Sequence, residues 1–298
     1  MRLVVGATGL LGSEICQLLA DEAKPWKALV RQMSDPSKRE ALKRLGAEIA
    51  VGDLKDRSSL DAACQGVSAV ISTASSTLSR QEGDTLASVD LQGQINLIDA
   101  ARAAGVEQFI FISFRHEANP DLEYPLKDAK RTVEEHLKRS GLEYTILRAG
   151  YFMEIWLSPA LGFDYTEAKA RIYGTGENAL SWVAVPDVAQ FAVACLDNPA
   201  SRHSVIEVGG PEALSPLAVV RLFEQVFGRT FSVEHVPVEA LQAQKQAASD
   251  PLQESFAALM LNYASGDAID MGETLQTFPV RLASVRDYAA RVADDSAS

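Results

Sequence analysis

The sequence contains few of the residues that build disulfide-linked, metal-binding or nucleic-acid-binding proteins. Its three cysteines, Cys16, Cys64 and Cys195, lie far apart, so neither a disulfide framework nor a zinc site is expected. Lys and Arg number 28 against 40 Asp and Glu, which gives a net charge of −12. Because phosphate backbones attract basic surfaces, this charge argues against a nucleic-acid partner. The sequence therefore predicts no metal site, and its cysteines are interpreted as small buried residues.

Long apolar stretches are also missing. No run approaches the roughly 20 residues that a helix needs to cross a bilayer. Met1-Arg2 is followed by only three apolar residues before Gly6, which is not the pattern of a secretion signal. We therefore expect a cytoplasmic protein without a transmembrane segment.

Short apolar runs alternate with segments of helical periodicity along the first two hundred residues. We expect six strands, at residues 2–5, 27–30, 48–51, 69–71, 108–113 and 143–147. Continuously apolar strands separated by helices predict an α/β fold, namely a Rossmann-type, doubly wound parallel sheet. The expected strand order is 3-2-1-4-5-6, with residues 204–208 adding a parallel strand beyond the sixth. One long helix is expected from about residue 84 to 104.

Beyond Arg148 the alternation becomes less regular, and aromatic residues, Ser-Pro and Gly are mixed together. No repeat or low-complexity linker separates two domains. The predicted division is therefore an NAD(P)-binding Rossmann core at 1–155, completed by 183–208. A smaller, interleaved C-terminal lobe for substrate or partner is predicted from 156–182 and 209–298.

A glycine-rich segment follows the first predicted strand and opens the first helix. Its spacing is Gly-x-x-Gly-x-x-Gly, and this strand-turn-helix context is the one that dinucleotide-binding loops require. Glycine allows a tight turn and a close approach of the pyrophosphate, while free N–H groups at the helix start face the anion. The predicted phosphate-binding residues are Gly6, Thr8, Gly9, Leu10, Leu11 and Gly12.

The second predicted strand ends in Val30-Arg31, where many NAD-specific folds have an acidic residue for the ribose 2′-hydroxyl. A guanidinium at this position suits a 2′-phosphate, to which it can donate paired hydrogen bonds. Lys38 adds a second positive charge nearby. The sequence therefore favours NADP(H) over NAD(H), although a solvated surface arginine is the alternative interpretation of Arg31.

Together with the glycine loop, the segments Ala28-Leu-Val-Arg31, Gly52-Asp53-Leu54, Phe109-Ile-Phe-Ile-Ser113 and Gly141-Leu-Glu-Tyr-Thr-Ile-Leu-Arg148 resemble the NmrA-like family. These proteins are atypical short-chain dehydrogenases/reductases, and the most similar group contains quinone reductase-like proteins and photosystem II assembly factors. The resemblance covers about the first two hundred residues, and Glu207-Val-Gly-Gly-Pro-Glu212 also fits. It implies NADP(H) in a doubly wound fold, with substrate bound between the core and the C-terminal lobe.

The resemblance also implies where the rest of the cofactor lies. Asp53 and Leu54 are expected beside the adenine, and Thr73, Ala74 and Ser75 beside the ribose. Tyr151 and Phe152 are expected to border the nicotinamide. Ser113, at the end of the fifth predicted strand, completes the predicted cofactor site.

The candidate catalytic residues depart from the pattern of the wider superfamily, in which Tyr-x-x-x-Lys lies on one helix face. Lys130 occupies the lysine position, but Leu126, which cannot transfer a proton, stands four residues earlier. Tyr124 precedes Pro125 and is expected outside the helix, from where its hydroxyl could still reach the site; Lys127 is another candidate. Lys130 is predicted to anchor the cofactor ribose or to donate a proton, unless it is a surface lysine paired with Glu134.

Two functions follow from these residues. The first is an NADPH-dependent reductase of a small carbonyl, quinone or enone. A row of aromatic residues favours it, because flat walls suit a flat substrate. Burial in the core is the alternative interpretation of the same residues. They are Tyr151, Phe152, Trp156, Phe163, Tyr165 and Trp182. The second is a non-catalytic NADP(H)-sensing regulator or assembly factor that acts on a protein partner, which the missing tyrosine favours. Sugar-nucleotide epimerisation is a weaker third possibility. Either a monomer or a homodimer is compatible with the sequence.

Overall fold

The computed structural model describes residues 1–22, 24–78, 80–115 and 119–297, and these residues form two compact units. Unit 1 comprises Met1–Ser113, Pro125–Arg148 and Val188–Ile206, and unit 2 comprises Phe114–Tyr124, Ala149–Asp187 and Glu207–Ser298. This division differs from the predicted one at 114–124, 149–155, 183–187 and 207–208, which group with unit 2. The side chains explain the difference, because Tyr124 bonds Asn262 and Tyr151 packs into the hydrophobic cluster of unit 2.

Unit 1 contains, wholly or for the most part, an alternating series of strands and helices. In chain order these are β1 Arg2–Val5, α1 Leu10–Asp21, β2 Trp26–Val30, α2 Pro36–Arg44, β3 Glu48–Val51, α3 Arg57–Ala63, β4 Ala69–Ser72, the π-helix η1 Leu86–Gly93, α4 Gln94–Ala103, β5 Gln108–Phe114, α5 Pro125–Arg139, β6 Glu143–Ala149, α7 Val185–Asp197, the 3₁₀ turn η3 Pro199–Ser201 and β11 Ser204–Val208.

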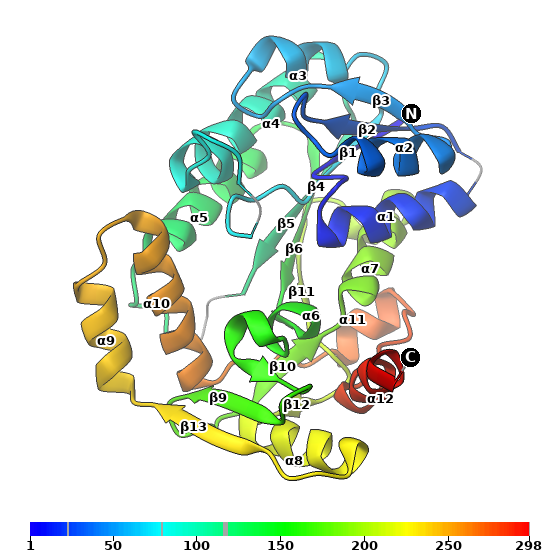
Figure 1. Cartoon of the computed structure of the whole chain (residues 1–298). Coiled ribbons are helices and arrows are strands. Elements are labelled where there is room, and N and C mark those ends of the chain that lie inside the picture. The colour runs from blue at the N-terminus through cyan, green and yellow to red at the C-terminus, as the bar shows by residue number, and fades with distance from the viewer. Residues whose placement is uncertain (23, 79, 116–118, 298) are drawn as a thin grey trace. The chain divides into compact units, whose positions relative to one another are not determined.

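The seven strands form one parallel sheet in the order β11-β6-β5-β4-β1-β2-β3. The register places Val5 beside both Leu29 and Ser72, so the glycine loop that follows β1 begins at the centre of the carboxyl edge. Figure 1 shows α1 and α7 on one face of the sheet and α3, α4 and α5 on the other. The predicted fold class, the strand order and the additional strand at 204–208 are confirmed.

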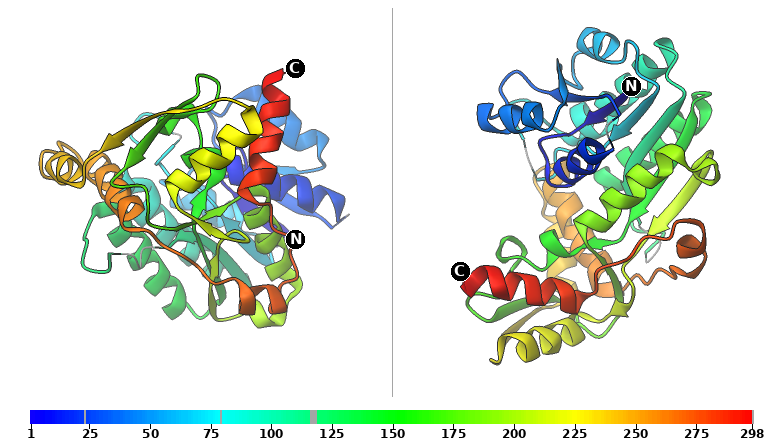
Figure 2. Two further views of the ribbon diagram at one scale, coloured as in Figure 1. Left: turned by 90° about the horizontal axis from the view of Figure 1, so that it is seen from below. Right: turned by 90° about the vertical axis from the view of Figure 1, so that its right-hand side faces the viewer.

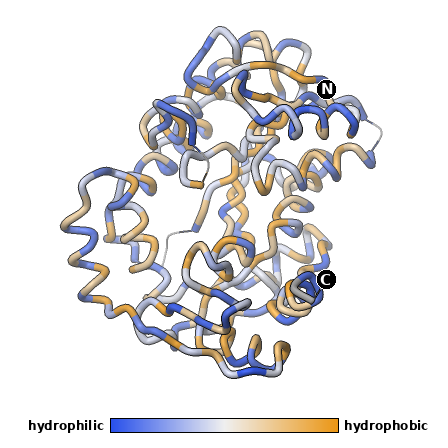
Figure 3. The backbone as a smooth tube through the Cα atoms, viewed as in Figure 1, coloured by the Kyte–Doolittle hydropathy of each residue, from blue (hydrophilic) through white to orange (hydrophobic). Residues whose placement is uncertain are grey.

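The core of unit 1 lies on the two faces of the central strands. In Figure 3 these strands are mostly apolar, and Leu3, Val70, Phe109 and Phe111 are fully buried. Because helices cover both faces of these strands, side chains on either face are buried, and each gains about 25 cal/mol per Å² of apolar surface removed from water. The strands therefore show no alternation with polar residues.

The segment predicted as one helix at 84–104 consists of two helices of different type. The π-helix η1 runs from Leu86 to Gly93, and the α-helix α4 continues from Gln94 to Ala103. A capping box begins η1, in which Thr85 and Ser88 exchange hydrogen bonds between side chain and backbone. Runs of π-helix are uncommon and frequently occur at functional sites, because the wider turn redirects the side chains that follow.

Unit 2 contains two small sheets, β12-β10-β7 and β13-β9-β8, and several helices. Figure 2 shows β13 beside β9 and α12 beside α8. Helices α9 and α10 pack against each other. The elements are β7 Tyr151–Phe152, α6 Met153–Trp156, the 3₁₀ turn η2 Pro159–Leu161, β8 Phe163–Asp164, β9 Lys169–Tyr173, β10 Leu180–Val183, β12 Ala213–Leu214, α8 Pro216–Phe227, β13 Ser232–Val236, α9 Val238–Gln246, α10 Pro251–Ser265, α11 Gly272–Thr277 and α12 Val285–Ala297.

Candidate functional site

The glycine loop between β1 and α1 has little room for side chains. Gly6 has a φ of +86°, and a Cβ at this residue would lie 2.5 Å from Thr73 Oγ1. A Cβ at Gly12 would lie 2.1 Å from the Gly6 carbonyl oxygen, so glycine is required for α1 to pack against the loop. At Gly9 the nearest atom to a built Cβ is the Gly6 oxygen, at 3.2 Å. The outer side of Gly9 is therefore open to an approaching group.

Helix α1 begins without a side-chain cap. Gly9 is its N-cap residue, and the first turn holds no acidic residue. Gly9 and Leu10 are exposed, and Thr8 and Leu11 are half-buried. The backbone N–H groups at the start of a helix carry partial positive charge and have no intrahelical acceptor. The six predicted residues therefore form a turn that fits the pyrophosphate of a dinucleotide.

Arg31 follows β2 and forms an ion pair with Asp84. Asp84 Oδ2 binds Arg31 and also accepts the Gln81 N–H, and Asp84 Oδ1 binds Lys55. Burial raises the pKa of Asp84, but these donors leave it below its ordinary value. The Asp84 side chain is 1% exposed, whereas those of Arg31 and Lys55 are 29% and 31% exposed. One buried carboxylate thus holds two partly exposed cations side by side.

Three other residues predicted for this side of the cofactor are Lys38, expected near the 2′-phosphate, and Asp53 and Leu54, expected beside the adenine. Lys38 is exposed on α2 and donates to the Thr8 carbonyl oxygen at 3.1 Å, which links α2 to the glycine loop. Asp53 is half-buried, and its Oδ1 accepts the Lys55 N–H. Leu54 is buried, and a Cβ at Gly93 would lie 2.8 Å from its own Cβ. Leu54 therefore packs closely against Gly93, at the end of η1.

The loop after β4 is held by side chains from η1 and α4. Asp90 Oδ2 accepts the Ser76 backbone N–H and its hydroxyl, at 2.9 and 2.6 Å. Gln94 accepts from Ser72 and donates to the Ala74 carbonyl oxygen. The predicted ribose-side residues Thr73, Ala74 and Ser75 are half-buried between these two supports.

Lys130 lies in the second turn of α5 and is 7% exposed. Its Nζ donates to the Ile112 carbonyl oxygen at 3.3 Å and lies 4.8 Å from the centre of the Phe111 ring. Burial lowers its pKa, and the charges of Asp90 and Glu134 oppose that effect. The ammonium is therefore located near the end of β5, and Lys130 is not the solvated surface lysine of the alternative interpretation.

Glu134 lies one turn after Lys130 but is bonded elsewhere. Arg148 donates to both of its oxygens, at 3.2 and 2.6 Å, and the Ser113 hydroxyl donates at 2.7 Å. Although burial raises the pKa of Glu134, these donors leave it below its ordinary value. Ser113, predicted to bind cofactor, directs its hydroxyl to this carboxylate.

Tyr124 immediately precedes α5, which confirms that it lies outside the helix. It is 1% exposed, its hydroxyl accepts a hydrogen bond from Asn262 at 3.0 Å, and its ring stacks on Phe114. Leu126 and Lys127, in the first turn of α5, are both buried. Tyr124 is thus integrated into unit 2, and the catalytic role considered for it gains no support from its surroundings.

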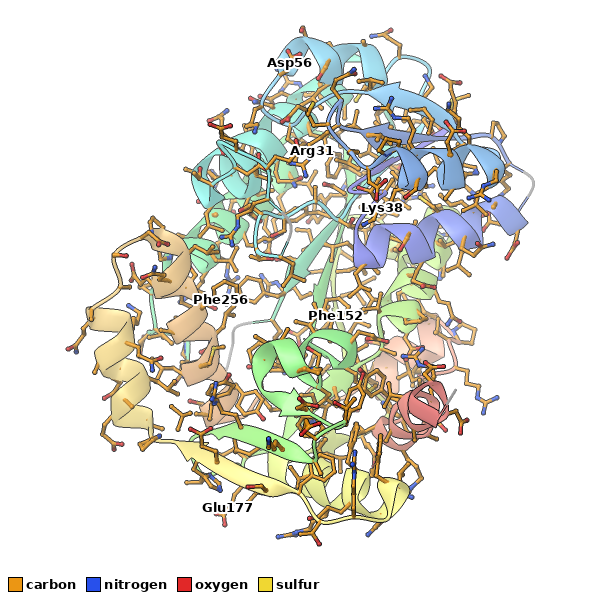
Figure 4. All side chains as sticks on the ribbon, in the orientation of Figure 1. Arg31, Lys38, Asp56, Phe152, Glu177 and Phe256 are labelled. Atoms are coloured by element: carbon orange, nitrogen blue, oxygen red, sulfur yellow. The ribbon has the colours of Figure 1, made fainter. Side chains whose placement is uncertain are left out.

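Five of the six aromatic residues considered as a substrate wall belong to the hydrophobic cluster of unit 2 or pack against it. Tyr151, Phe163 and Trp182 are buried in it, and the partly buried Trp156 and Tyr165 pack on it. Burial raises the pKa of the Tyr151 hydroxyl well above its ordinary value, so it is a poor proton donor. Phe152 and Phe256, both labelled in Figure 4, are half-buried and stand outside that cluster. Phe256 lies in α10 and belongs to no sequence motif, so it was not among the residues predicted from the sequence.

Other kinds of site are not supported by the residues that the structure describes. They include no group of three or more His, Cys, Asp or Glu side chains able to hold a metal ion. Across the same ranges, no helix combines the length and the apolar character needed to cross a membrane. A hollow of about 290 Å³ is lined by Met1, Arg2, Ser68 and Gln108, at the amino ends of β1, β4 and β5. It is at the sheet edge opposite to the glycine loop.

The parallel sheet, the glycine loop at its carboxyl edge and the uncapped α1 define a Rossmann-type dinucleotide-binding protein. Residues 2–277 match the NmrA-like family. The chain belongs to this family of NADP-binding, Rossmann-fold oxidoreductases.

The relatives include enzymes and an assembly factor. The chain is 31% identical over 281 residues to NAD(P)H azoreductase of Xenophilus azovorans, covering 94% of this chain and 92% of that protein. It is 31% identical over 249 residues to the photosystem II assembly factor Ycf39 of Trieres chinensis, covering 82% and 74%. A crystal structure of an NADPH-dependent quinone oxidoreductase from Escherichia coli, complexed with NADPH, superposes with a TM-score of 0.79. At 22% identity it covers 98% of this chain and 100% of that one, and it shows the shared fold.

Proposed function

We propose that this protein is an NADPH-dependent reductase of a small, flat carbonyl, quinone or enone. The observation that carries the proposal is the buried Lys130 ammonium at the end of β5, in the same unit as an open glycine loop. A lysine whose pKa is lowered by burial, beside a candidate cofactor loop, is the kind of group that functional sites contain.

The preference for NADP(H) over NAD(H) rests on the cations around Asp84. Arg31 and Lys55 share this one carboxylate, and Lys55 also lies 3.8 Å from Asp53. The side chains of both cations remain partly exposed, at 29% and 31%. A 2′-phosphate is a dianion near neutral pH and suits partly exposed cations, whereas a 2′-hydroxyl gains little from them. Arg31 is therefore proposed to contact the 2′-phosphate, and Lys55 is added to the residues predicted from the sequence.

The residues of unit 1 bind and orient the cofactor, which supplies a hydride when bound. Backbone N–H groups of Gly9 to Gly12 hold the pyrophosphate, and the loop at 73–75 borders the ribose. Lys130 donates hydrogen bonds to the ribose hydroxyls and so fixes the orientation of the nicotinamide. Proton donation by Lys130 would require a near-neutral pKa, so the anchoring role ranks first.

The substrate class rests on two aromatic side chains of unit 2. Phe152 and Phe256 are half-buried, and they are not needed for the core cluster that holds Tyr151 and Trp182. Apolar rings left partly exposed on a globular unit suit contact with a flat, apolar ligand.

Turnover is the direct test. Purified protein is mixed with NADPH and a panel of quinones, enones and an azo dye, and oxidation is followed at 340 nm. Steady oxidation with one substrate class supports the reductase. Tight NADPH binding by calorimetry with no turnover on any panel member contradicts it.

A second candidate is a sensor that binds NADP(H) and reports to a protein partner without turnover. One observation favours it: the Tyr124 hydroxyl is buried and bonded to Asn262, and the tyrosine position of the superfamily is occupied by the buried Leu126. Among the described residues of α5, none offers a phenol one turn before Lys130. A partner whose affinity changes with the redox state of the added cofactor would support this candidate.

A further inference from the structure

Four ionisable side chains are buried together in unit 1, and they come from three elements. Lys130 and Glu134 lie on α5, Arg148 on β6 and Asp90 on the π-helix η1. Asp90 and Glu134 are 0% exposed, and Lys130 and Arg148 are 7% and 9% exposed. Buried charges are tolerated where they compensate one another, so the partner of each charge can be sought within this group.

Glu134 cannot be the main counter-charge of Lys130. Both of its oxygens accept hydrogen bonds from Arg148, and one also accepts from Ser113. The Glu134–Arg148 pair is therefore neutral as a unit. The positive charge of Lys130 is left facing a carbonyl oxygen of β5 and the Phe111 ring, which are both uncharged.

Asp90 has a carboxylate oxygen to spare. Its Oδ2 accepts the backbone N–H and hydroxyl of Ser76, which are neutral donors. Its Oδ1 is buried and accepts no hydrogen bond from any described residue. Buried carboxylate oxygens are normally satisfied. Because no described cation forms an ion pair with this one, its charge is left to act on buried groups of the elements packed around it. The helices α5 and η1 pack against each other, and Asp90 is the larger of the two carboxylate influences on Lys130.

We propose that Asp90 is a positioning residue for Lys130: its buried carboxylate charge, acting across the packed α5–η1 interface and not through a direct ion pair, favours the charged form of the ammonium at the carboxyl edge of unit 1. The π-helix is the structural reason that Asp90 can do this, because its side chain reaches the Ser76 loop from a helix that packs against α5. One carboxylate then couples the loop beside the predicted ribose site to the lysine. The consequence for cofactor binding rests on the proposed function; the charge state of Lys130 does not.

The first measurement needs no cofactor. Protein is labelled with ¹³C at lysine Cε, and the Lys130 signal is assigned by its loss in Lys130→Met. Its pKa is then measured by NMR titration in the wild type, in Asp90→Asn and in Ser76→Ala. Asp90→Asn is nearly isosteric and removes the charge, so the Lys130 pKa should fall by about one to three units. Ser76→Ala removes only the hydroxyl hydrogen bond to Asp90, keeps the backbone N–H bond and leaves the carboxylate charge, so the Lys130 pKa should change by less than half of that amount.

An unchanged Lys130 pKa in Asp90→Asn overturns the proposal. If Asp90→Asn does not fold, the Lys130 pKa of the wild type still tests the proposal. A wild-type Lys130 that is neutral at pH 7.5 would overturn it, because no carboxylate would then be keeping the lysine charged. NADPH affinity is the second readout. Asp90→Asn should match the wild type at a pH below both measured Lys130 pKa values, and should lose about tenfold or more at a pH between them, where only the lysine of the variant is deprotonated. If the pKa falls but no protein binds NADPH, the proposed function fails and the Asp90–Lys130 relationship stands.

Discussion

Arg148 donates hydrogen bonds to both carboxylate oxygens of Glu134 and so joins β6 to α5 through a pair that is almost completely buried. Their side chains are 11% and 1% exposed. Removing one partner of such a pair leaves an uncompensated buried charge, which costs about 3–5 kcal/mol.

Arg148→Met should therefore lower the free energy of unfolding by about 3–5 kcal/mol at pH 7, measured by urea denaturation. The paired change Arg148→Met with Glu134→Leu should cost less than Arg148→Met alone, because no charge remains buried without its partner. Arg139→Met serves as the control, since Arg139 is exposed and pairs with Glu135 on the surface of the same helix. A double variant as unstable as the sum of the single ones would contradict the pairing.

Arg31 determines the second prediction, on cofactor choice. Arg31→Ala should weaken NADPH binding by roughly ten- to a hundredfold and leave NADH binding almost unchanged, because a charged contact to the 2′-phosphate is lost. Lys43→Ala is the matched control, since Lys43 is an exposed cation of α2 that pairs with Glu40. Calorimetry with both cofactors is the measurement. Equal affinity of the unchanged protein for NADPH and NADH would reject the claim without any variant.

Lys55→Met gives a third prediction, which distinguishes a role of Lys55 in binding the 2′-phosphate from a purely structural role. Asp84 retains Arg31 and the Gln81 N–H when Lys55 is lost, so the cluster should remain folded. NADPH affinity should fall by a smaller factor than in Arg31→Ala, with NADH again unaffected. An equal loss for both cofactors would show that Lys55 supports the loop rather than the phosphate.

Much of unit 1 could be predicted from the chain because local features determine it. Continuous apolar strands such as β5 and the Gly6–Gly12 spacing specify a buried parallel sheet and a tight turn regardless of what packs around them. The additional strand β11 was predictable for the same reason. These features are carried by residues adjacent in sequence.

Side-chain directions could not be predicted in this way. Ser113 ends β5 as expected, but its hydroxyl is directed to Glu134 because α5 brings that carboxylate alongside. Tyr151 was expected to border the nicotinamide, and its ring lies among Trp156, Trp182 and Tyr263. Asp90 gave no sequence signal, because its importance depends on a π-helix that the 84–104 periodicity does not distinguish from an α-helix. Each of these depends on contacts between distant segments.

Lys130→Met tests the anchoring role directly. Methionine is an apolar side chain of similar length that fits the same buried position over Phe111. It leaves the buried Asp90 carboxylate without the Lys130 charge, so the free energy of unfolding should fall too, and affinity is compared on folded protein only. NADPH affinity should fall by about tenfold or more, from the lost hydrogen bonds to the ribose. Lys138→Met, on the same helix but paired with Glu135 at the surface, is the control. Circular dichroism checks the fold, and unchanged NADPH affinity in Lys130→Met would remove Lys130 from the site.

Asp187 provides a pH-dependent prediction in unit 2. It lies in the first turn of α7, is 3% exposed, and accepts the Ala283 N–H at 2.8 Å. Burial is the largest cause that raises its pKa from 3.8 to about 6. The negative charges of Glu154 and Asp287 raise the pKa further, whereas the Ala283 N–H and the positive charge of Arg291 lower it. Because its pKa is raised in the folded state, the protonated form is the stabilising one. That contribution is complete below pH 3.8 and is lost as the pH rises through about 6.

Asp187→Asn should therefore stabilise the protein at pH 8 by about 1–3 kcal/mol, and the difference should shrink as the pH falls towards 4. Asn keeps a carbonyl oxygen for the Ala283 N–H, so the hydrogen bond that joins 283 to α7 can persist. Asp287→Asn is the matched control, and its effect on the free energy of unfolding should have the opposite sign. Hydrogen bonds from Ser284 hold the pKa of Asp287 below its ordinary value, so this carboxylate stabilises at neutral pH and its loss should destabilise there. Urea denaturation of the three proteins between pH 4 and 8 measures both effects. A lower stability of Asp187→Asn than of the wild type at pH 8 would mean that Asp187 is charged and bound by a partner in the folded protein, contrary to the raised pKa.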